Sequence, residues 1–146
     1  MFNNKPYHFS KKSASNLDSC HEDLQNILKD VIKYIDLSVI CGSRGKLEQD
    51  KAFALGKSKV KYPNSKHNNN PSLAVDIVPC PLDWNDLVSF EVLIRFIQGY
   101  SLGKYNIRLR AGIDFNSNWK QDDSFVDAPH LELHSKLIEG HWVKYE

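Results

Sequence analysis

The chain has 146 residues, of which 41% are hydrophobic and 11% are aromatic. This length is typical of one domain, and the composition supplies a core without disulfides or oligomerisation. The 19 Lys and Arg side chains nearly balance the 18 Asp and Glu side chains, so the formal net charge is only +1. This balance excludes attraction to nucleic acid or to an anionic membrane through overall charge. We expect a monomer with no nucleic-acid and no membrane partner.

The cysteines and the N-terminal residues bear on the compartment. Cys20, Cys41 and Cys80 form no Cys-x-x-Cys pair, which argues against a disulfide framework and against a zinc knuckle. Residues 1–6 lack the apolar core of a signal peptide, and no apolar run approaches the roughly 20 residues that cross a bilayer. We therefore expect a product that is soluble in the cytoplasm at synthesis.

The N-terminal part of the chain predicts an arm followed by a helix. Residues 1–14 show no hydrophobic period and are expected to form an extended arm before a domain over 15–146. From Leu17 to Ile35, apolar residues recur at intervals of three and four. This spacing predicts one amphipathic helix.

A strand, a second helix and a basic loop are expected next. The β-branched stretch at 37–41 ends at Gly42 and predicts a strand, and the helix formers at 47–55 stop at Gly56. With no arginine and little aromatic character in the following loop, we interpret its lysines as solvated and not as a contact for a polyanion. These lysines are Lys57, Lys59, Lys61 and Lys66.

The rest of the chain predicts one more helix and three more strands. Residues 86–100 are apolar nearly all round, which predicts a helix mostly enclosed by the fold. Residues 73–78, 107–110 and 130–134 have the composition or alternation of strands. The predicted fold class is α+β in a single domain, with packed helices and a small antiparallel sheet formed by the later strands.

Two histidines and one aspartate are candidate metal ligands. His67 follows Ser65-Lys66, Asp76 lies on the strand after it, and His130 begins a later strand. Three ligands of this kind are what a catalytic zinc uses, because a fourth position stays open for water. The helical His-Glu-x-x-His motif of many metalloproteases is absent.

A base that does not bind the metal is also needed, and Asp127 is the candidate. It lies three residues before His130, with Pro129 stiffening the link between them. The alternative is that Asp127 is only a turn or cap residue. His134 is left out of the site, because four residues along a strand span about 13 Å, which is too far to share one zinc with His130.

Six short motifs follow one another along the chain. They are Gly42-Ser43-Arg44, Glu48-Gln49, Ser65-Lys66-His67, Ala74-Val75-Asp76, Arg110-Ala111-Gly112-Ile113-Asp114-Phe115 and Asp127-Ala128-Pro129-His130-Leu131-Glu132. In this order they resemble the motifs of a known family: the zinc D,D-carboxypeptidases and L-alanyl-D-glutamate endopeptidases that act on peptidoglycan, including phage endolysins. The resemblance implies a fold like that of the hedgehog and D,D-peptidase proteins. It also implies zinc as the cofactor and peptidoglycan stem peptides as the substrate.

Two features depart from the commoner family pattern. His67 and Asp76 are nine residues apart where the pattern has seven, although a longer loop can close on one metal at little entropic cost. Asp127 stands where many carboxypeptidase relatives carry Glu, which resembles the phage endolysin branch. The expected function is therefore a zinc endopeptidase of bacteriophage lysis that cleaves stem peptides. The alternatives are a D-alanyl-D-alanine carboxypeptidase or dipeptidase, and a non-catalytic wall-binding module.

Other motif residues have weaker functional assignments. Arg44 is expected to bind a substrate carboxylate or the developing oxyanion, the alternative being a surface ion pair. Ser65 is expected either to contact substrate or to form the turn. Structural roles are expected for Gln49 and Asp114. Among the aromatic residues, Trp84, Phe115 and Trp119 are candidates to line a cleft, and core packing is the favoured alternative for Trp84.

Overall fold

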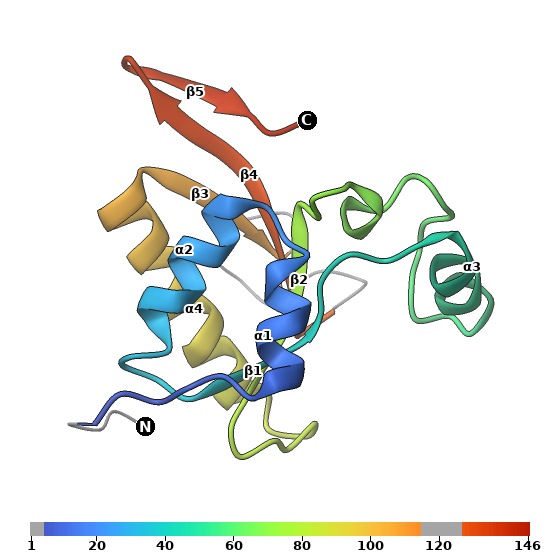
Figure 1. Ribbon diagram of the computed structural model, residues 1–146, viewed down its shortest axis with the longest axis horizontal. Helices are drawn as coiled ribbons and strands as arrows, with labels where there is room; N and C mark the ends of the chain where they lie inside the picture. The colour runs from blue at the N-terminus through green and yellow to red at the C-terminus, as the bar shows by residue number, and fades with distance from the viewer. Residues whose placement is uncertain (1–4, 115–126) are drawn as a thin grey trace.

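A computed structural model describes residues 5–114 and 127–146, and its elements alternate between helices and strands (Figure 1). The predicted α+β class with an antiparallel sheet is confirmed. The elements are α1 (Lys11–Asp18), α2 (Glu22–Val31), β1 (Leu37–Cys41), α3 (Lys46–Ala54), the 3₁₀ turn η1 (Lys66–Asn68), β2 (Ala74–Pro79), α4 (Leu87–Tyr105), β3 (Ile107–Ala111), β4 (His130–Ile138) and β5 (His141–Lys144).

The five strands form one sheet in the order β1-β2-β4-β3, and β5 pairs with the far part of β4. All neighbouring strands are antiparallel. Two features differ from the prediction. The early strand β1 joins the later strands, and β5 was not predicted. The chain reverses between β4 and β5 at Glu139 and Gly140, which both have positive φ angles, of 50° and 81°.

The sheet separates the apolar core from a polar face. Because side chains alternate along a strand, Val75 and Ile77 of β2 and Leu131 and Leu133 of β4 all point into the core. Asp76, between Val75 and Ile77, and His130 and Glu132, on either side of Leu131, therefore point to the opposite face.

The prediction of one helix from Leu17 to Ile35 is wrong, because the chain breaks between α1 and α2. Ser72 accepts a hydrogen bond from the backbone of His21 at 2.8 Å and donates one to Ser19 at 3.0 Å. The His21 side chain then caps α2 by accepting a hydrogen bond from the backbone N–H of Asp23. A contact with a residue distant in the sequence thus overrides the local helical period. Helix α1 begins at Lys11, so the predicted boundary between an extended arm and the domain at residue 14 falls inside a helix.

Helix α4 covers the sheet with one side only, so the prediction of a mostly enclosed helix is wrong. Phe90, Leu93 and Ile97 are buried against the core, whereas Val88 is 71% exposed and Val92 is 40% exposed. Helices α1, α2 and α4 lie together, and α3 stands apart from them with the connection to η1 (Figure 1). Among the described residues, no helix combines the length and the apolar character needed to cross a membrane.

Candidate metal centre and cleft

The register of the sheet brings two of the predicted ligands together. Asp76 of β2 and His130 of β4 are directly opposed cross-strand partners. Their side chains share the polar face, and Oδ1 of Asp76 lies 3.4 Å from Nδ1 of His130. The antiparallel pairing alone therefore places a carboxylate beside an imidazole.

The third residue, His67, is delivered by η1. The Ser65 side chain caps this turn by accepting a hydrogen bond from the N–H of His67 at 3.2 Å, and Asn68 completes a capping box. The backbone carbonyl of His67 accepts a hydrogen bond from the N–H of Arg44 at 2.8 Å. The turn is thus tied to the chain that follows β1. Ser65 has a structural role here, and its contact with substrate remains a prediction.

Three donor atoms converge at this point. Nε2 of His67 lies 3.2 Å from Oδ1 of Asp76 and 3.2 Å from Nδ1 of His130. Together with the 3.4 Å between Asp76 and His130, these distances form a nearly equilateral triangle. Ligands about 2.0–2.1 Å from a tetrahedral zinc are separated by about 3.3–3.4 Å, so the donor set fits this ion. The nine-residue spacing between His67 and Asp76 does not prevent their approach.

The outer nitrogen of each imidazole is also engaged. Nδ1 of His67 lies 2.7 Å from the carbonyl oxygen of Gly42, to which it donates. Nε2 of His130 lies 2.9 Å from Oε1 of Glu132. Both side-chain orientations are therefore fixed, with the other nitrogen of each ring free to face Asp76. At Gly42 a Cβ atom would lie 2.2 Å from the carbonyl oxygen of Asn16, which explains why glycine stands there.

The electrostatics of this cluster follow from burial and close pairing. Burial alone would raise the pKa of Asp76, but hydrogen bonds from His130 and His67 outweigh it and hold that pKa well below its usual range. Burial likewise opposes the charged form of His67 and His130, and the bonds to Asp76 outweigh it and raise both pKa values. The carboxylate of Asp76 thus attracts positive charge into a buried position, a role that a metal cation can also fill.

Asp127 is held beside the cluster by the backbone of Gly112. Its N–H donates to the carbonyl of Gly112 at 2.9 Å, and the N–H of Gly112 donates to the carbonyl of His130 at 2.7 Å. A Cβ atom on Gly112 would lie 2.1 Å from the carbonyl oxygen of Asp127, so only glycine permits this approach. Burial, followed by the nearby charge of Asp76, raises the pKa of Asp127.

Arg44 joins the cluster to helix α3. Its Nη2 lies 3.4 Å from Oδ2 of Asp76, and its Nη1 donates to Oε1 of the buried Gln49 at 3.1 Å. Gln49 also donates to the Ser58 hydroxyl at 2.9 Å and to the Val60 carbonyl at 2.7 Å. The predicted structural role of Gln49 agrees with these bonds. Asp114, also expected to be structural, is buried and pairs with Arg95 at 3.2 Å.

Two residues near the cluster were not assigned a role from the sequence. Glu132 could have been found, because it ends the last of the six motifs and shares the β4 face of His130. Cys41 gave no such signal. Its Sγ lies 3.9 Å from Nδ1 of His67 and 3.6 Å from Nη2 of Arg44. Donor atoms of Cys41, His67 and Asp76 are close enough to form a metal site, as are those of Asp76, Asp127 and His130.

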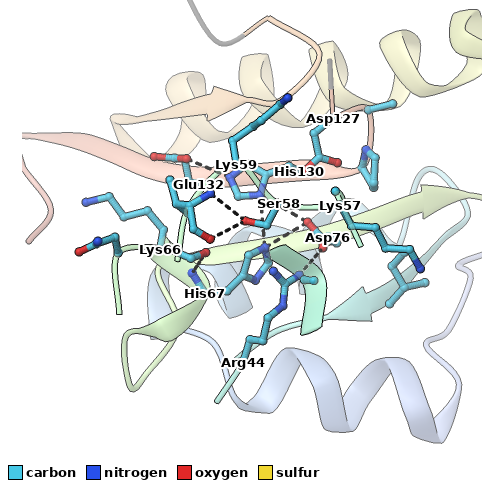
Figure 2. Close-up of a pocket in the computed structure, with 18 of the residues that line it drawn as sticks. Arg44, Lys57, Ser58, Lys59, Lys66, His67, Asp76, Asp127, His130 and Glu132 are labelled. Carbon is cyan, nitrogen blue, oxygen red and sulfur yellow. Dashed lines mark hydrogen bonds and ion pairs between the residues drawn. The ribbon is translucent and has the colours of Figure 1, made fainter. Parts of the chain in front are cut away.

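The cluster lies in a cleft of about 1130 Å³. The cleft is bounded by the segment after α3, by η1 and by the residues around His130 (Figure 2). Trp84 also lines it and is 55% exposed, so the expectation of core packing is wrong; the ring stacks on Phe90 at 5.6 Å. Phe115 and Trp119 lie outside the described residues. His134, as expected, stands apart on an exposed part of β4.

Comparisons with known proteins give the class of this chain. The family model for the phage L-alanyl-D-glutamate peptidases matches residues 5–134. The chain belongs to this family. A crystal structure of Serratia marcescens L-Ala D-Glu endopeptidase ChiX is similar, with a TM-score of 0.56 and 22% identity over 86% of this chain and 90% of that chain. This likeness shows a shared fold. No curated protein sequence matches the chain.

Proposed function

We propose that the protein is a zinc-dependent L-alanyl-D-glutamate endopeptidase that cleaves the stem peptides of peptidoglycan. The observation that carries the proposal is the triangle of His67, Asp76 and His130 at the base of the cleft, with edges of 3.2, 3.2 and 3.4 Å. Family membership supports the choice of the L-alanyl-D-glutamate bond as the one cleaved, because the matching family model is named for peptidases of this specificity. In this role the protein acts on the bacterial cell wall during phage lysis.

His67, Asp76 and His130 would hold the zinc. When bound, zinc supplies a Lewis acid that polarises a peptide carbonyl and acidifies water. Gly42 and Glu132 orient the two imidazoles, so the ligands are set before the metal arrives. A site arranged in this way loses little energy to reorganisation when the ion binds.

Asp127 would take the proton from the attacking water and deliver it to the leaving amine. The residue is partly buried, and its backbone is fixed by Gly112. Its pKa is raised toward neutral pH, and a carboxylate with such a pKa can both accept a proton and release it again. Arg44 would bind the substrate carbonyl or a carboxylate through the part of its guanidinium not engaged with Gln49 and Asp76.

The proposal is tested by metal analysis and by product analysis on purified muropeptides. The expected result is one zinc per chain and mass-spectrometric products that separate L-Ala from D-Glu. His67→Ala, Asp76→Ala and His130→Ala should each lose most of the metal and nearly all activity. Release of D-Ala alone would indicate a carboxypeptidase, and peptidoglycan binding without cleavage would indicate a wall-binding module. Either result, or a full zinc equivalent in His130→Ala, would overturn the proposal.

A further inference from the structure

Positive charge is concentrated at the cleft. Five cationic side chains and three carboxylates line it, a formal excess of two positive charges, whereas the whole chain carries a net charge of only +1. Such a concentration in a concave site attracts anionic ligands. The cations are Arg44, Lys57, Lys59, Lys66 and Arg110, and the carboxylates are Asp76, Asp127 and Glu132.

Two of these cations form no ion pair with a carboxylate of the described residues. Arg44 pairs with Asp76 at 3.4 Å, and Arg110 lies 3.9 Å from Glu132. By contrast, no carboxylate within residues 5–114 and 127–146 forms an ion pair with Lys57 or Lys66. The charge of Lys66 helps to lower the pKa of Glu132, but that carboxylate lies closer to Arg110, with which it pairs. Both lysine ammonium groups can therefore still contact a ligand.

The backbone that carries these lysines is held in place. The N–H groups of Lys57 and Ser58 both donate to the carbonyl of Ala52, at 2.9 and 3.1 Å, and Gln49 fixes the segment that follows. Lys66 belongs to the capped turn η1. The interpretation of this stretch as a solvated loop is therefore incomplete, since these lysines line the cleft. Only Lys61 turns elsewhere, over the ring of Phe53 at 5.1 Å.

Lys57 and Lys66 lie on opposite sides of the side-chain cluster formed by His67, Asp76 and His130 (Figure 2). Figure 2 shows Lys66 on the side of Glu132 and Lys57 on the other side. A peptide bound over the cluster would extend toward both sides, so different residues of it would approach the two lysines. The arrangement therefore suits a ligand with carboxylates on two different residues.

We infer that Lys57 and Lys66 bind free carboxylates of the stem peptide, so that the enzyme selects stems whose residues after the cleaved bond are not amidated. The inference rests on the proposed function. Cleavage at L-Ala–D-Glu places the α-carboxylate of D-Glu next to the reacting bond, and the following residue adds another where it is a diamino diacid. A lysine suits such groups because its compact ammonium lies on a long flexible stem.

The test compares kcat/KM on three synthetic peptides with the zinc-loaded protein. The parent is L-Ala-γ-D-Glu-L-Lys-D-Ala; the second has the D-Glu α-carboxylate as a carboxamide, and the third has diaminopimelate in place of lysine. The wild type should prefer the third peptide, then the parent, then the carboxamide. Each of Lys57→Gln and Lys66→Gln should reduce one of these preferences by about two- to fivefold. The preference that is reduced in each variant identifies the carboxylate that the substituted lysine binds.

The double variant Lys57→Gln/Lys66→Gln should reduce the full preference by about tenfold, whereas Lys51→Gln should leave it unchanged. Lys51 is the matched control, because it is an exposed lysine on α3 outside the cleft. Unfolding temperatures should be equal in all variants. Equal cleavage of the three peptides, or an unchanged preference in the double variant, would overturn the inference and leave the proposed function standing. Failure of the wild type to cleave any of them would overturn both.

Discussion

Nε2 of His130 donates a hydrogen bond to Oε1 of Glu132 at 2.9 Å, two residues along the same strand. Burial raises the pKa of Glu132, but the bond from His130 outweighs burial, and the resulting pKa lies below the usual value. The carboxylate therefore accepts, and Nε2 carries the proton. The proton on Nε2 leaves Nδ1 as the nitrogen that faces His67 and Asp76, and Nδ1 would give up its own proton when a metal binds.

Glu132→Ala should therefore weaken zinc binding by about 10- to 100-fold while the protein remains folded, and Glu132→Gln should weaken it less. Competition with a chromophoric chelator measures the affinity without reference to activity. Glu48→Ala serves as the control, since Glu48 is an exposed carboxylate on α3. An unchanged zinc affinity in Glu132→Ala would show that the bond to His130 does not orient the ligand.

Cys41→Ser should retain a full equivalent of zinc. Although Sγ of Cys41 lies 3.9 Å from Nδ1 of His67, this nitrogen already donates to the carbonyl of Gly42 at 2.7 Å. A metal held by this nitrogen would break that bond, so the thiol is not expected to be a ligand. Zinc analysis after dialysis decides the matter, with His67→Ala as the comparison. Loss of zinc in Cys41→Ser would place the sulfur in the ligand set.

The predicted ligands come together through several structural features, and only some of these can be predicted from the sequence. The strands that carry Asp76 and His130 follow from local alternation, and the shared polar face follows from the period of two. Their direct opposition depends on the β2–β4 register, which no local pattern specifies. The same is true of the break after α1, which depends on Ser72, and of the position of Cys41 beside His67.

The glycines of the motifs can be recognised in the sequence, but the reason why glycine is needed there is visible only in the structure. Gly42 and Gly112 each lie against backbone oxygen atoms, closer than any Cβ atom could approach. Trp84 shows where composition misleads. Its aromatic ring favoured the core, yet the ring covers Phe90 from outside and lines the cleft.

Asp127→Asn should keep the zinc and the fold while reducing turnover by about 10²–10⁴, the usual contribution of a positioned general base. The amide is nearly the same size and still permits the backbone bonds to Gly112. Zinc content and kcat are measured on one preparation. Because donor atoms of Asp127, Asp76 and His130 lie close enough to share an ion, loss of zinc would identify Asp127 as a ligand. Unchanged turnover would mean that another group accepts the proton.

Asp30 should contribute to stability in a pH-dependent way. Hydrogen bonds from Lys104, Tyr105 and Tyr100 lower the pKa of Asp30 from 3.8 to about 2. A carboxyl group whose folded pKa is depressed stabilises the protein above its unfolded pKa, and this contribution is lost as the pH falls from about 4 to about 2. Asp30→Asn should therefore lower the free energy of unfolding by about 1 kcal/mol at pH 7, after allowance for solvent screening.

Urea denaturation of the wild type and of Asp30→Asn, at pH 7 and again near pH 2, measures this difference. The two proteins should converge at the lower pH. Lys33→Ala is a useful comparison, because Lys33 also pairs with Asp30, at 3.7 Å, but its side chain is 60% exposed. A difference between wild type and Asp30→Asn that persists undiminished near pH 2 would assign the effect to packing and not to charge.

Substitutions of Arg44 distinguish between two roles of its guanidinium: binding a substrate carboxylate and stabilising the developing oxyanion. Its guanidinium is already bonded to Gln49 at 3.1 Å and lies 3.4 Å from Asp76, so its position is fixed before substrate arrives. Arg44→Lys keeps the charge but loses the planar fork, and kcat/KM should fall by about 10- to 100-fold, the range for a charged hydrogen bond. Lys46→Ala should leave it unchanged, since Lys46 is exposed on α3 and pairs with Asp50.

The division of that loss between KM and kcat identifies the partner of Arg44. A contact with a carboxylate, present equally in substrate and transition state, would raise KM and spare kcat. A contact with the developing oxyanion would lower kcat instead. Arg44→Ala should lose more than Arg44→Lys in either case, because Asp76 then also loses a cation. Wild-type kinetics in both variants would mean that the guanidinium only joins Gln49 to Asp76 and makes no contact with the reacting peptide.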